Sequence, residues 1–167
     1  MFSNLFLSED GYPHLPRKHQ MQTFIGTKII KAVPLTRAEY NAYRSWDMPS
    51  DEVGTDEGYL VEYTDGGKPN DSRHEGYISW SPKEQFDNAY RQCSGMSFGL
   101  AIEAMKKGHN VARTGWNGTG MFAYYVPAAS HSVSTYRAYM VLKATDGTFV
   151  PWAPSCSDAL ADDWMIV

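Results

Sequence analysis

The loop Gly115–Gly120 is the stretch of this sequence whose residue types best suit the binding of a small molecule. Its glycines let the backbone turn tightly and approach another group closely. Between them lie Trp116 and Asn117. The indole of Trp116 either packs into the core or offers a ligand a flat stacking surface. Asn117 either forms an Asx turn or reads an adenine edge or a ribose, because its amide both donates and accepts hydrogen bonds.

Arg113, just before this loop, is the residue best suited to hold a phosphate. Its planar guanidinium can give a phosphate two parallel hydrogen bonds. The alternative for Arg113 is a surface ion pair. Further candidate ligand-binding residues are aromatic or polar and lie elsewhere in the C-terminal half: Phe98, Asp146, Trp152 and Ser157. Ser157 has two interpretations, as the N-cap of a short helix to Ala161 and as a hydrogen-bond donor to a phosphate or ribose.

Catalytic and metal-binding patterns are missing from the sequence. No histidine stands in a plausible relay with a serine or cysteine, and no Gly-x-Ser-x-Gly, Walker loop or dinucleotide fingerprint occurs. Cys93 and Cys156 have no metal or redox spacing, and His14 and His19 have no obvious third ligand. The sequence therefore favours a binding protein over an enzyme, with no catalytic residue, cofactor or metal.

The elements that must position these candidates are a helix and several strands. Ser97 is the expected N-cap of a helix whose apolar positions share one face and which ends at Gly108. Strands are expected from Asn110, over 121–126, over 138–144 and up to Trp152, and 127–136 is expected to be a loop. The strand 121–126 is apolar on both faces, which predicts burial by its own helix on one side and by a partner chain on the other.

In the N-terminal part, the sequence predicts an extended arm over residues 1–23 and a small folded unit over residues 24–92. The unit reads as a strand, a helix, two strands and a second helix. Thr36 and Glu39 have the spacing of a capping box, and Ser81 is the expected N-cap of the second helix, with Pro82 at its first position. A short linker leads to the C-terminal unit, 96–167. The predicted fold class is α+β, with two small antiparallel-sheet units, each with one or two helices, of which the C-terminal one oligomerises.

The composition and net charge of the chain limit the kinds of binding partner that are expected. The 167 residues carry a net charge of −4 without a basic run, which argues against binding of bulk nucleic acid. Aromatic residues make up 14% of the chain, which favours contact surfaces or ligand pockets. No apolar run approaches the length of a membrane span, and the N-terminus does not read as a signal peptide. A cytoplasmic protein without membrane partners is expected.

Residues 96–167 resemble a known family. The likeness is carried in order by these features: Ser97-Phe98-Gly99, Val111-Ala112-Arg113, Gly115-Trp116-Asn117-Gly118, Gly120-Met121, Asp146-Gly147, Val150-Pro151-Trp152 and Leu160-Ala161-Asp162-Asp163-Trp164. Their order and spacing resemble the second type of Thoeris anti-defense protein. The resemblance implies a non-enzymatic phage sponge that binds cyclic ADP-ribose isomers made by TIR-domain defense enzymes in the host cytoplasm. It also implies that some relatives bind cyclic oligonucleotides, and that the protein is a homo-oligomer, typically a tetramer, with ligand pockets between protomers.

The N-terminal half has a weaker resemblance and leaves two alternatives open. Three segments are similar to a part of small tailed-phage accessory proteins to which no activity attaches: Thr36–Tyr40, Gly58–Tyr63 and Gly76–Lys83. A phage protein-interaction module without a small ligand is one alternative to the sponge. A hydrolase that degrades the signal is the other, and product analysis separates it from a sponge.

Overall fold

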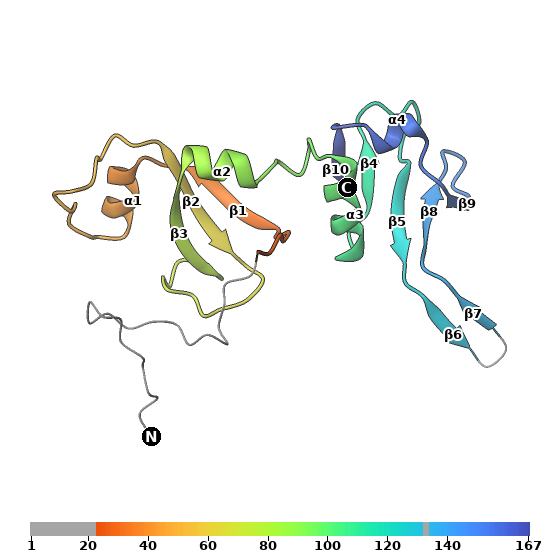
Figure 1. The fold of residues 1–167 in the computed structure, drawn as a ribbon, viewed down its shortest axis with the longest axis horizontal. Helices are drawn as coiled ribbons and strands as arrows, with labels where there is room; N and C mark the ends of the chain where they lie inside the picture. Colours follow the sequence, from red (N-terminus) through yellow and green to blue (C-terminus); the bar gives the residue numbers. More distant parts are fainter. Residues whose placement is uncertain (1–22, 132–133) are drawn as a thin grey trace, which may run out of the picture.

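The computed structural model describes residues 23–131 and 134–167, and it shows an α+β protein with two antiparallel sheets (Figure 1). The sheets have three and five strands, and short helices accompany each. The predicted α+β class with two small antiparallel-sheet units is confirmed, and the predicted oligomerisation of the C-terminal unit stays a prediction. The predicted arm, 1–23, lies almost wholly outside the described residues.

The N-terminal unit is built on the order β1-β2-β3. Its elements are β1 (Ile30–Pro34), α1 (Arg37–Tyr43), β2 (Gly58–Tyr63), β3 (Tyr77–Pro82) and α2 (Lys83–Ala89). The central strand β2 pairs in register with both neighbours, from Ile30↔Tyr63 on one side to Gly58↔Pro82 on the other. Apolar residues of α1 and the sheet form its core: Tyr40, Leu60 and Ile78.

The two predicted helix starts in this unit had different outcomes. The capping box at Thr36 is confirmed, because the Thr36 hydroxyl accepts from the Glu39 backbone N–H and the Glu39 carboxylate accepts from the Thr36 backbone N–H at 2.8 Å. The prediction that Ser81 caps α2 was wrong. Ser81 pairs with Tyr59 inside β3, the strand continues to Pro82, and Pro82 is the N-cap residue. Sheet pairing therefore outweighs the local capping preference.

A buried carboxylate closes the long β2–β3 connection. Glu62, only 8% exposed, accepts from the backbone N–H groups of Glu75 and Gly76 at 3.0 Å each. Its other oxygen lies 3.3 Å from His74 Nδ1, and His74 Nε2 lies 2.8 Å from the Tyr43 hydroxyl. The hydrogen bond from Gly76 is the main cause that lowers the pKa of Glu62. This chain of contacts ties the end of α1 to the sheet.

The linker between the units is hydrogen-bonded rather than free. Met96 and Trp164 exchange backbone hydrogen bonds of 2.8 and 3.1 Å, and Ile166 N–H donates to the Cys93 carbonyl at 2.9 Å. The linker thus covers the outer edge of β10 (Trp164–Ile166), which would otherwise present unpaired backbone groups.

The C-terminal unit is a five-stranded sheet in the order β10-β4-β5-β8-β9. Its elements are α3 (Phe98–Lys106), β4 (Val111–Arg113), β5 (Phe122–Val126), β8 (Tyr139–Lys143), β9 (Phe149–Trp152), α4 (Cys156–Ala159) and β10. Ser97 is the N-cap residue of α3, as predicted, although its side chain makes no capping bond. Gly108 follows the helix at φ 91°, a conformation that favours glycine.

The segment expected to be a loop, 127–136, contains a short hairpin. β6 (Ala129–His131) pairs with β7 (Ser134–Tyr136) and extends the sheet strands β5 and β8 outward (Figure 1). The prediction of a plain loop was wrong because Ser- and Ala-rich strands carry little hydrophobic alternation for a pattern to detect.

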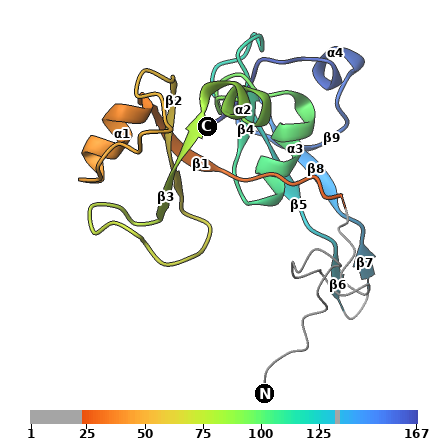
Figure 2. The ribbon, with the colours of Figure 1, turned by 60° about the vertical axis from the view of Figure 1, so that its left-hand side comes forward.

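Helix α3 covers one face of this sheet (Figure 2). The core between them is fully or nearly fully buried and consists of Met96, Ala101, Ala104, Met105, Val111, Ala123 and Trp164. Because side chains alternate along a strand, the neighbours of Ala123 on β5 point to the opposite face. The second face therefore carries Phe122, Tyr124 and Val126.

Candidate functional site

The glycine-rich loop follows β4 and is held close to its surroundings. The backbone N–H of Trp116 donates to the Arg113 carbonyl at 3.2 Å, and the backbone N–H of Gly115 donates to the Asp163 carboxylate at 2.8 Å. A Cβ at Gly118 would lie 2.2 Å from Thr145 Cγ2 and 2.3 Å from Met121 Sδ, so a larger residue would displace the loop. The loop thus packs against the turn after β8.

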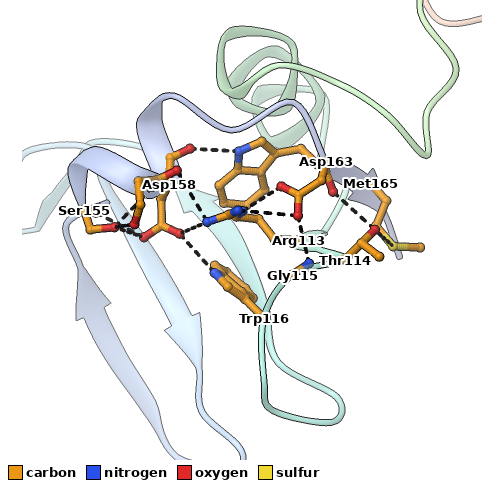
Figure 3. Close-up of polar contacts among 10 residues, drawn as sticks. Arg113, Thr114, Gly115, Trp116, Ser155, Asp158, Asp163 and Met165 are labelled. Carbon is orange, nitrogen blue, oxygen red and sulfur yellow. Dashed lines mark hydrogen bonds and ion pairs between the residues drawn. The ribbon is translucent and has the colours of Figure 1, made fainter.

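Arg113 lies between two carboxylates (Figure 3). Its Nη1 donates to Asp158 Oδ1 at 2.9 Å, and its Nε donates to Asp163 Oδ1 at 2.7 Å. The Arg113 side chain is 18% exposed. The hydrogen bonds that Arg113 donates to both carboxylates raise its pKa, and those to Asp163 contribute most. The structure thus shows Arg113 in ion pairs with two carboxylates, and its predicted contact with a phosphate stays a prediction.

The Asp158 carboxylate accepts hydrogen bonds from three residues of this cluster (Figure 3). Oδ1 accepts from Trp116 Nε1 at 3.1 Å as well as from Arg113, and Oδ2 accepts from the Ser155 hydroxyl at 2.7 Å and the Ser155 N–H at 3.1 Å. Burial raises the pKa of Asp158, but the hydrogen bonds from Ser155, Trp116 and Arg113 outweigh it and hold the pKa at about 2. Asp158 is therefore a carboxylate at neutral pH.

An aromatic cluster lies beside these charges. Trp116 makes edge contacts with Trp152 and Trp164, with ring centroids 5.9 and 5.4 Å apart. Phe98 contacts Trp152 at 6.2 Å and Trp164 at 5.2 Å. Trp164 is fully buried, whereas the other three rings are partly exposed. Both interpretations of Trp116 thus keep a structural basis, since its ring packs on the core and retains an exposed part.

The structure brings five of the seven predicted site residues into one cluster: Phe98, Arg113, Trp116, Trp152 and Ser157. Ser157 joins it through its carbonyl, 3.4 Å from Arg113 Nη1. Asn117 is exposed in the loop beside Trp116. Asp146 lies in the turn after β8, where its carboxylate accepts from the Thr148 N–H at 2.9 Å and its hydroxyl at 2.6 Å. The roles of all seven residues as ligand contacts stay predictions.

Three polar residues of the cluster were not among the predicted site residues: Ser155, Asp158 and Asp163. The N-cap of α4 is Ser155 rather than Ser157, because Asp158 stands at N3 and completes a capping box. The spacing Ser155-x-x-Asp158 is a signal that would have identified this cap. Asp163 pairs with Arg113, which stands fifty positions earlier in the sequence. No local pattern reports such a distant contact.

Acid is expected to destabilise this cluster. The pKa of Asp158 is lowered from 3.8 to about 2, so below pH 4 the unfolded chain takes up a proton more readily than the folded one. Stability from this group is complete above about pH 4 and is lost as the pH falls towards 2, by on the order of 2 kcal/mol. The measurement is the free energy of urea unfolding against pH for the wild type and Asp158→Asn. A variant with the same slope between pH 4 and 2 as the wild type would contradict the assignment.

Two hollows in the described residues lie away from this cluster. Two neighbouring hollows of about 430 and 820 Å³ follow the linker and share Lys28, Tyr90, Cys93 and Ile166 among their lining residues. None of the seven predicted site residues lines either one. The chemistry of aromatic and polar groups favours the cluster around Trp116 as the candidate site.

Residues 23–131 and 134–167 lack two features that would point to other functions. No helix in these ranges is long and apolar enough to span a membrane. No group of three or more His, Cys, Asp or Glu residues in them is arranged to hold a metal ion.

The fold and the cluster define a small α+β domain with an aromatic and polar surface suited to binding. Residues 96–167 match the Thoeris anti-defense 2-like domain. Thoeris anti-defense 2 of Bacillus phage SP01 is 37% identical over 84 residues, an alignment that covers 43% of this chain and 94% of the relative. The chain belongs to the Thoeris anti-defense 2-like family. The match begins at Met96, so residues 1–95 lie outside the family domain.

Proposed function

We propose that this protein is a phage anti-defense protein that binds and sequesters a cyclic, nucleotide-derived immune signal without degrading it. The observation that carries the proposal is the family match over the whole of residues 96–167. The proposed signal is a cyclic ADP-ribose isomer, a cyclic oligonucleotide, or both, in the cytoplasm of the infected cell. The proposed domain division is 24–92 for the accessory unit and 96–167 for the signal-binding domain.

The surface around Trp116 supports the proposal through its chemistry. The exposed parts of Trp116 and Trp152 offer flat rings to a base, and Phe98 stands against Trp152. Asn117, Asp146 and Ser157 offer groups for base edges and ribose hydroxyls. A phosphate would approach Arg113, whose charge two carboxylates now balance.

The second face of the C-terminal sheet supports a homo-oligomer. Phe122, Tyr124 and Phe149 form a ring cluster with centroids 6.2 to 6.5 Å apart. Phe149 is 56% exposed and Tyr139 on the adjacent strand is 43% exposed. Exposed apolar surface of this kind marks an interaction site. We propose that this face is buried against other copies in a homotetramer, and that signal pockets form between protomers.

Calorimetric titration of the full chain with TIR-generated cyclic ADP-ribose isomers and a panel of cyclic di- and trinucleotides tests the function. Tight binding is expected, with intact ligand recovered after heat denaturation. A chemically altered ligand would identify a hydrolase instead. Absence of binding to every probe would refute the proposal and turn attention to residues 24–92 as a protein-interaction module.

Trp116→Ala is expected to weaken binding of the signal identified in this way. Loss of one base–aromatic stack costs about 1–3 kcal/mol, which corresponds to roughly a 5- to 150-fold rise in Kd. The matched control is Trp46→Ala, which removes a half-exposed indole from the N-terminal unit. Equal affinities of wild type and Trp116→Ala would remove Trp116 from the site.

A further inference from the structure

The Asp158 carboxylate connects parts of the chain that are far apart in sequence. Its Oδ1 accepts from Arg113 at the end of β4 and from Trp116 in the glycine-rich loop, and its Oδ2 accepts from Ser155 at the start of α4. The Asp158 carbonyl also accepts from Trp164 Nε1 at 3.1 Å. The side chain is 13% exposed, so most of its surface faces these donors rather than water.

These contacts fix the orientation of the Trp116 ring. The indole has one polar donor, Nε1–H, and Asp158 accepts it. Trp152 and Trp164 contact the same ring at interplanar angles of 87° and 78°. The indole is therefore held at its sides as well as at its nitrogen, whose hydrogen bond to Asp158 is drawn in Figure 3. Part of the ring remains exposed. A ring held in this way meets a ligand without first losing conformational freedom.

Asp163 provides the contrast. It binds the same guanidinium and the Gly115 N–H, at 2.7 and 2.8 Å. Its hydrogen bonds thus hold the backbone of the loop, whereas the hydrogen bond from the indole goes to Asp158. The two carboxylates share Arg113 and differ in their relation to Trp116.

We propose that Asp158 is a positioning residue for signal binding: it presets the Trp116 ring for stacking on a base and does not touch the ligand. The inference rests on the proposed function, since stacking requires a ligand with a base. It adds a residue outside the predicted ligand contacts, and it assigns the Arg113–Asp158 pair to the preparation of the site.

The first test needs no ligand. The indole Nε1–H resonance of Trp116 is followed by NMR in the wild type, Asp158→Ala and Asp163→Ala. Asp158→Ala is expected to shift this resonance and to speed its exchange with water, because the acceptor is gone. Asp163→Ala is the matched control, which removes the other carboxylate of Arg113 and is expected to leave the indole resonance in place. An unshifted resonance in Asp158→Ala would overturn the proposal.

The second test is a double-mutant cycle on signal affinity. Trp116→Phe keeps an aromatic face and loses the N–H, and it leaves the bonds of Asp158 to Arg113 and Ser155 intact. Each single change is expected to raise the Kd about tenfold. The double variant Trp116→Phe, Asp158→Ala is expected to bind no more weakly than the weaker single variant, since both changes break one contact.

The outcomes separate the two proposals. Additive losses in the cycle would show that Asp158 acts through the fold alone, and unchanged affinity in Asp158→Ala would show that it does not position Trp116 for the ligand. Either result overturns the inference while the wild type still binds its signal. A wild type that binds none of the cyclic signals refutes the proposed function first, and the positioning role falls with it.

Discussion

Replacing Trp164 with alanine is expected to destabilise the C-terminal unit by about 3–5 kcal/mol, the range for deletion of a fully buried large aromatic side chain. The indole of Trp164 has no exposed surface and contacts Phe98, Trp116 and Trp152 at centroid distances of 5.2 to 6.0 Å. Its Nε1–H donates to the Asp158 carbonyl. Domains of this size are stabilised by only about 5–15 kcal/mol, so the variant is expected to lose a large share of its stability.

The measurement is urea unfolding of the full chain, followed by circular dichroism so that the removed fluorophore does not affect the signal. Trp46→Ala is the matched control, because Trp46 is 52% exposed in the N-terminal unit. Its unfolding midpoint is expected to stay close to that of the wild type. Equal midpoints for the two variants would show that the aromatic cluster is not the centre of the C-terminal core.

The starts and ends of the helices and strands show what the sequence can and cannot reveal about this fold. The helix starts at Thr36 and Ser97 were predictable because a cap depends on residues within one turn. The first of the two strands predicted between the helices of the N-terminal unit corresponds to β2, since its sequence carries the pattern itself. The prediction that Ser81 is an N-cap was wrong because pairing with β2, and not the residues next to Ser81, decides where β3 ends. Local sequence patterns thus predict which helices and strands form, whereas strand pairing decides where a strand ends.

The same distinction between local and long-range information applies to the candidate site. Trp116, Arg113 and Asn117 were identified from residue types that suit a base, a phosphate and a polar edge. The carboxylates that hold Arg113 stand 45 and 50 positions away, so only the fold could show that they meet it. The resemblance to the anti-defense family was visible in the sequence, and the match over residues 96–167 confirms it.

A negative charge on the second face of the C-terminal sheet is expected to dissociate the proposed oligomer. Phe149 lies on the edge strand β9, and its ring contacts Phe122 and Tyr124 on the same face. Because Phe149 is 56% exposed, Phe149→Glu removes little of the protomer's own core. In an oligomer the new carboxylate would be buried without a partner, at a cost of several kcal/mol. The variant is therefore expected to sediment as a monomer under conditions in which the wild type is a tetramer.

The matched control is Tyr77→Glu, which places the same charge at a 47% exposed aromatic residue on β3 of the N-terminal sheet. Its mass is expected to equal that of the wild type. If signal pockets form between protomers, Phe149→Glu should also lose signal binding, although its side chain lies on the face opposite to the core of α3. A monomeric wild type, or a Phe149→Glu variant that keeps the wild-type mass, would show that the second face does not bind another copy. A monomeric variant with full affinity would place the whole pocket within one protomer, on the surface around Trp116.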